Sequence, residues 1–236
     1  MRARGSLRAV AFVVLAAAVV IWTAVAPHLD TVGLWPTVAI ISVAVLPATL
    51  GLLYLALPVW PSRRVIVAGI VFGVAAIVSW EVGSHLVANF AKLGAYTCAG
   101  WVFLRLFEEL SWVVLVSAII PFVDALSVAA GPTKAIVNHH IEVYSAVAVS
   151  FVGPGGPASF LGPPDVLFFA LFLAAALRWR LRPLWTWLAM TGMYALTLVL
   201  TVATDANGLP ALPFLSAGFL LANADLIWRR LRPRRG

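Results

Sequence analysis

Two aspartates interrupt apolar segments of this chain and are its strongest candidates for chemistry. Asp124 lies within IIPFVDALSV and Asp165 within LGPPDVLFFALF. A carboxylate at membrane depth costs about 2.5–3.5 kcal/mol on insertion scales, so its presence there indicates a function. Two carboxyls that lie close together cannot both ionise cheaply, and they share a proton near neutral pH. Such a pair can activate water as general base while its acid form protonates a leaving group.

The composition indicates the environment in which these carboxyls act. The chain has 236 residues, 63% of them hydrophobic, and a mean hydropathy of +1.02. Soluble domains average about 45–50% apolar residues. The sequence therefore predicts an all-α, polytopic transmembrane helical bundle, located in the cell membrane.

A membrane span needs about 20 apolar residues, and eight segments qualify. They are residues 9–27, 36–59, 65–82, 86–106, 110–130, 164–181, 184–203 and 210–228. The first, with its basic start, is interpreted as a retained span rather than a cleaved signal peptide. Residues 1–236 form one membrane domain, which comprises N-terminal spans (1–109), a four-helix half (110–228) and a basic tail (229–236).

Basic residues predict the orientation of the spans. The net charge is +7, and arginines cluster near residues 2–8, 63–64, 178–182 and 229–235. With eight spans these clusters fall on one side, which places both termini in the cytoplasm. They also suit anionic lipid headgroups, and a nucleic-acid partner is not favoured. Asp225 is predicted to pair with Arg229 one helical turn later.

One long connection, residues 131–163, separates the two aspartate segments. Residues 145–152 partly alternate small or polar with apolar residues, which is a weak strand signal. The edge of such a strand could pair with a further extended backbone. His139 and His140 lack the cysteines or carboxylates that would complete a metal site, so we expect no metal and no cofactor.

Successive spans cross the membrane in alternating directions, and this alternation predicts that the two aspartates and a proline-rich segment meet. Asp124 lies near the end of one span, Asp165 at the start of the next, and the GLPALPFL segment at the start of the last. In an antiparallel bundle these three positions lie at the same membrane face. The sequence thus predicts two carboxyls and a proline-rich helix start in one place.

These motifs resemble the presenilin and signal-peptide-peptidase family of intramembrane aspartyl proteases, as a divergent, prokaryote-like member. That family carries YD on one helix, GxGD on the next and PAL at a later helix start, and the resemblance covers residues 110–228. Here Val123 replaces the tyrosine, and Pro164 replaces the second glycine.

The resemblance implies a presenilin-like C-terminal half in which Asp124 and Asp165 are the catalytic residues. It also implies a cleft formed by Gly162, Pro210, Ala211, Leu212 and Pro213. Substrates would be transmembrane segments or remnant signal peptides, and the charge bias favours segments whose N-termini are cytoplasmic. The oligomeric state is not indicated.

Other interpretations remain open at this point. Asp165 follows two prolines and can serve as a helix-capping residue, and Asp124 can form a structural hydrogen bond to another helix. Intramembrane aspartates also serve proton-coupled transporters and channels. A catalytically inactive family member that binds membrane segments is the third alternative.

Overall fold

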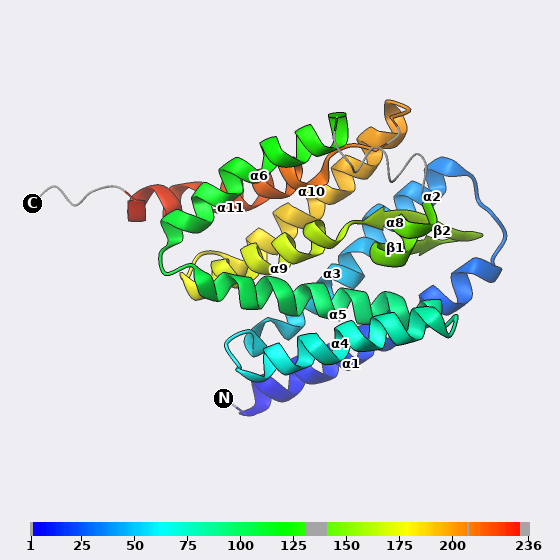
Figure 1. Ribbon diagram of the computed structural model, residues 1–236, viewed down its shortest axis with the longest axis horizontal. Helices are drawn as coiled ribbons and strands as arrows, with labels where there is room; N and C mark the ends of the chain where they lie inside the picture. Colours follow the sequence, from blue (N-terminus) through cyan, green and yellow to red (C-terminus); the bar gives the residue numbers. More distant parts are fainter. Residues whose placement is uncertain (1, 131–140, 207, 232–236) are drawn as a thin grey trace, which may run out of the picture.

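Helices form at all eight apolar segments in the computed structural model, which describes residues 2–130, 141–206 and 208–231 (Figure 1). The helices are α1 (Arg2–Val25), α2 (Leu34–Ile40), α3 (Leu46–Ala56), α4 (Arg64–Glu81), α5 (His85–Phe103), α6 (Leu110–Ala130), α8 (Ile141–Val147), α9 (Pro163–Arg178), α10 (Pro183–Ala203) and α11 (Ala211–Leu231). A π-helical turn, Ile41–Val45, joins α2 to α3. The all-α prediction therefore holds, with the addition of one short β-hairpin.

Six helical segments within the described ranges are long and apolar enough to cross a membrane. α5 and α9 are not among them. Asn89 and Lys92 make α5 less apolar, and α9 has only 16 residues. The helix that carries Asp165 is thus shorter than a typical span, and the count of eight spans stays a prediction.

The short helix α9 lies at the centre of the bundle. Every side chain from residue 169 to residue 176 is fully buried, because α5, α10 and α11 all pack against this helix. α5 approaches it very closely at Gly100, where an added Cβ would lie 2.2 Å from the carbonyl oxygen of Leu167. The packing of α9 thereby determines the position of its first turn, which carries Asp165.

The remaining long helices surround this centre. α4 packs on the outer side of α5, α6 packs along α11, and α1 packs along α3. Large apolar side chains of α1, α4 and α6 are exposed, which suits contact with lipid chains.

Several arginines hold one end of the bundle together. Arg8 donates to the carbonyls of Tyr54 and Leu55 at the end of α3. Arg105 likewise donates to Ser62 (2.7 Å), and Arg178 donates to Leu104 (3.0 Å). These side chains thus join backbone carbonyls at helix ends and in the loop before α4 to neighbouring helices.

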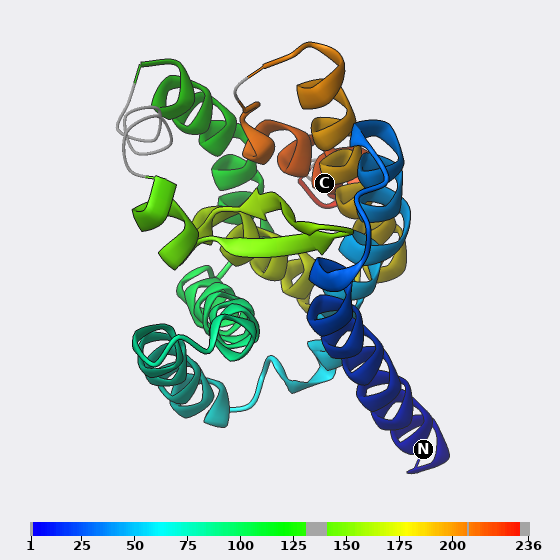
Figure 2. The ribbon, with the colours of Figure 1, turned by 90° about the vertical axis from the view of Figure 1, so that its right-hand side faces the viewer.

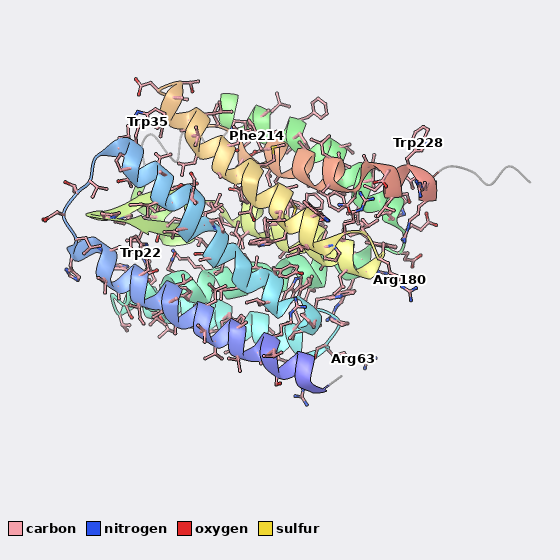
Figure 3. All side chains as sticks on the ribbon, turned by 180° about the vertical axis from the view of Figure 1, so that it is seen from behind. Trp22, Trp35, Arg63, Arg180, Phe214 and Trp228 are labelled. Atoms are coloured by element: carbon pink, nitrogen blue, oxygen red, sulfur yellow. The ribbon has the colours of Figure 1, made fainter. Side chains whose placement is uncertain are left out.

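The start of α1 and the end of α11 lie at this same end of the molecule, together with Arg63 and Arg180 (Figures 1 and 3). The pairing predicted for Asp225 is wrong. Its carboxylate binds Arg182, the N-cap residue of α10, at 2.8 Å instead of Arg229. The clustering of basic residues is thus observed, whereas the side of the membrane that they face stays a prediction.

The long connection contains α8 and a hairpin of β1 (Val149–Gly153) and β2 (Gly156–Leu161). The antiparallel register pairs Val149 with Leu161 and Ser150 with Phe160. The hairpin lies in the middle of the end opposite the arginines (Figure 2). The strand predicted over residues 145–152 is correct only from Val149, since residues 145–147 are helical. His139 and His140 lie outside the described residues.

Gly100 provides a test of the central packing. Gly100→Ala should lower the free energy of unfolding by about 1–3 kcal/mol or more, because the new methyl group collides with backbone that cannot rotate away. The matched control is Gly73→Ala on α4, where an added Cβ meets nothing within 4 Å. Unfolding of both variants in detergent, followed by circular dichroism, measures the difference. Equal stability of the two variants would contradict the assigned crossing.

Candidate functional site

Asp124 binds the start of α11. It lies three residues after Pro121 on α6 and is partly buried. Its Oδ2 accepts a hydrogen bond of 3.1 Å from the backbone N–H of Leu212. The first N–H groups of a helix lack intrahelical partners, and a carboxylate there also interacts favourably with the helix dipole. The predicted meeting of Asp124 with the 210–213 segment is therefore confirmed.

The backbone of the PALP segment, residues 210–213, presents an N–H donor to Asp124. That donor is the N–H of Leu212. The helix start itself accommodates Pro210 and Pro213, because proline is tolerated in a first turn, where an N–H would be unpaired. Ala211 is the first residue of the helix.

Asp165 occupies the third position of α9. Gly162 is the N-cap, Pro163 and Pro164 fill the first two positions, and the N–H of Gly162 donates to Oδ2 of Asp165 at 2.8 Å. This is the carboxylate half of a capping box. The prediction that Asp165 can serve as a helix-capping residue is thus confirmed by this hydrogen bond. It uses one carboxylate oxygen and leaves Oδ1 with no recorded partner in the described part of the chain.

The two carboxylates belong to one electrostatic site. Asp124 and Asp165 interact with each other, and both act on Tyr144 of α8 and Tyr194 of α10. Four elements that are distant in sequence therefore bring their polar groups to one place.

Tyr144 is the member of this site that lies outside the long helices. Burial, followed by the negative charges of Asp165 and Asp124, raises the pKa of Tyr144 to about 12. Its phenol thus remains protonated throughout the physiological pH range and can donate a hydrogen bond. The ring lies edge-on to Phe160 of β2, with centroids 6.0 Å apart.

Tyr194 fixes the backbone at Asp165. Its hydroxyl donates to the carbonyl oxygen of Asp165 at 2.8 Å. The ring is buried and stacks on Phe169 with centroids 5.9 Å apart. Sequence reasoning missed both tyrosines, because neither lies in a polar motif or at a spacing that relates it to an aspartate.

Two surface grooves lie elsewhere on the molecule. One of about 480 Å³ is lined by residues of α10 and α11, including Arg182 and Trp185. The other, of about 210 Å³, lies between α1 and the α2–α3 segment. Neither of these two grooves is lined by Asp124 or Asp165.

No protein-family model, curated protein or solved structure matches this chain. The family resemblance of the motifs therefore stays a prediction.

The contact made by Tyr194 gives a stability prediction. Tyr194→Phe should lower the free energy of unfolding by about 1 kcal/mol, the net contribution of one hydrogen bond. Tyr194→Leu should cost more, because it also removes the aromatic stack and leaves unfilled volume. Denaturant titration of both purified variants measures these changes. Wild-type stability of Tyr194→Phe would show that the hydroxyl does not support the first turn of α9.

Proposed function

We propose that this protein is an intramembrane aspartyl protease that hydrolyses peptide bonds in transmembrane segments or remnant signal peptides. The observation that carries the proposal is the site itself. Asp124 binds the start of α11, and Asp165 caps the start of α9, so two half-buried carboxylates are held by backbone donors within an apolar helical bundle. The order of the motifs supports the same class of enzyme.

The chemistry needs only water and the two carboxyls. One carboxylate takes a proton from water as the oxygen attacks the carbonyl carbon of the scissile peptide bond. The second carboxyl protonates the amide nitrogen as the C–N bond breaks, which yields a new carboxyl terminus and a new amine. The two aspartates exchange these roles of acid and base, so one proton shared by the pair is sufficient.

Each aspartate is held by a backbone group that does not titrate. The N–H of Leu212 orients Asp124, and the N–H of Gly162 orients Asp165. Such preorganised donors keep a catalytic carboxylate in one geometry without a further side chain. The protonated phenol of Tyr144 is available to donate to the carbonyl oxygen of the substrate.

A substrate strand would add to β2 rather than to residues 145–152. Both backbone groups of Ser150 bind the side chain of Asn89 (2.8 and 2.9 Å), and the carbonyl of Val152 binds Trp22 (2.8 Å). The outer edge of β1 is therefore occupied. Antiparallel alternation turns the N–H and C=O of Phe160, the partner of Ser150, toward the opposite edge. An unwound substrate needs such backbone partners in an apolar environment.

A catalytically silent protein that binds membrane segments is the second candidate. The capping role of Asp165, together with Pro163 and Pro164 before it, favours this alternative, because a structural function alone accounts for that carboxylate. Cleavage activity separates the two candidates, and it also separates the protease from a proton-coupled transporter.

The test of the pair is cleavage of a single-span model substrate by purified protein in lipid. Asp124→Asn and Asp165→Asn should each reduce the rate by about 100-fold or more, since each removes one partner of acid–base catalysis. Asp205→Asn is the matched control, because this exposed residue lies in the turn after α10. Its rate should equal that of the wild type. Wild-type cleavage by either of the first two variants would exclude the aspartate pair as the catalytic centre.

The proposed substrate edge has a test of its own. Phe160→Pro removes the outward N–H of β2 and should reduce cleavage at least about 10-fold, while Phe160→Val keeps that N–H and should retain most activity. Both variants lose the ring contact with Tyr144, so their difference isolates the backbone donor. If the two variants cleave at the same rate, β2 does not pair with the substrate. Near-equal melting temperatures of the variants exclude unfolding as the cause of a difference.

A further inference from the structure

Three polar side chains of α5 bind the connection that follows α6. Asn89, Lys92 and Tyr96 are spaced by three and four residues, so they lie on one face of the helix. The ammonium of Lys92 donates to the carbonyls of Ser145 (3.0 Å) and Ala148 (2.6 Å). The hydroxyl of Tyr96 donates to a third carbonyl between these two, that of residue 147, at 2.7 Å. We name these three α5 residues the connection clamp.

Lys92 is buried, with only 6% of its surface exposed. An unpaired charge in such a place is costly, and here the carbonyls at the end of α8 compensate for it. The C-terminal end of a helix carries partial negative charge and favours a nearby cation. The ammonium also lies 5.1 Å from the ring centroid of Trp80 on α4. The position of Lys92 therefore determines where α8 ends.

Asn89 holds the next part of the same segment. Its amide group binds both the N–H and the C=O of Ser150, at 2.8 and 2.9 Å. In this way the side chain takes the place of a neighbouring strand along β1. Because β2 is paired with β1 in a defined register, Asn89 also holds β2 in place.

The connection clamp thus holds backbone next to two features of the aspartate site, Tyr144 and β2. Tyr144 directly precedes the carbonyls that Lys92 and Tyr96 bind. β2 runs from the hairpin turn to Gly162, the N-cap that donates to Asp165. A strand advances about 3.3 Å per residue, so a small displacement of the hairpin would present a different peptide bond to the aspartates.

We propose that Asn89, Lys92 and Tyr96 are positioning residues that align a substrate strand with the aspartate pair and so determine which peptide bond is cut. This inference rests on the proposed protease function. It assigns the selection of the cleavage position to α5, a helix that carries neither aspartate.

The experiment compares the products of one single-span substrate by mass spectrometry. Lys92→Met removes the two hydrogen bonds of the ammonium while keeping an unbranched apolar chain, and Asn89→Leu removes the amide. Each should change the ratio of neighbouring cleavage products by roughly fivefold, the equivalent of one hydrogen bond. Lys92→Arg should restore the wild-type ratio, because the guanidinium can donate to the same carbonyls. Thr97→Val is the matched control, since its buried hydroxyl donates within α5 to Leu93.

The outcomes separate the inference from the proposed function. Continued cleavage by Asp124→Asn and Asp165→Asn would refute the protease itself. If those variants are inactive, but Lys92→Met and Asn89→Leu release the wild-type products in the wild-type ratio, the clamp has only a structural role. Should Lys92→Met fail to fold, Tyr96→Phe decides the question by the same product ratio. That variant loses one hydroxyl and keeps its ring.

Discussion

The structure depends on one constraint: backbone polar groups that leave regular helices inside an apolar bundle must find partners. The connection between α6 and α9 contains a helix end, a hairpin and a helix start, and each exposes such groups. Side chains from other helices satisfy them. Lys92, Tyr96 and Asn89 bind the segment around α8 and β1, and Trp22 of α1 reaches Val152. These polar residues allow an irregular segment to pack within the bundle.

The two aspartates obey the same constraint. Asp124 satisfies the N–H of Leu212, and Asp165 satisfies that of Gly162. A costly carboxylate is thereby made tolerable, and an unpaired helix start is satisfied at the same time. In each carboxylate, one oxygen, Oδ2, accepts this structural hydrogen bond. Capping and catalysis are compatible roles, because a fixed backbone donor restrains the orientation of a carboxylate that still has a second oxygen.

The bundle concentrates irregular structure at one end and regular, arginine-stabilised structure at the other. At the arginine end, Arg8, Arg105 and Arg178 bind carbonyls of neighbouring helices. At the hairpin end, the outer edge of β2 lies on the same hairpin as Phe160, whose ring contacts Tyr144, and the two carboxylates act on that tyrosine. The buried helix α9 connects the two ends, which couples the position of Asp165 to the packing of the whole interior.

The sequence by itself determined the helical segments, the membrane class and the meeting of Asp124 with the last helix, because hydropathy and span parity are carried by residues close in the chain. Only the tertiary structure decided the rest. It placed Asp165 on a short buried helix, paired Asp225 with Arg182, brought two tyrosines to the aspartates and bound β1 to Asn89. Each of these four features depends on which helices are neighbours. The local periodicity of the sequence shows which face of a helix is apolar, but it does not identify the helix that packs against that face.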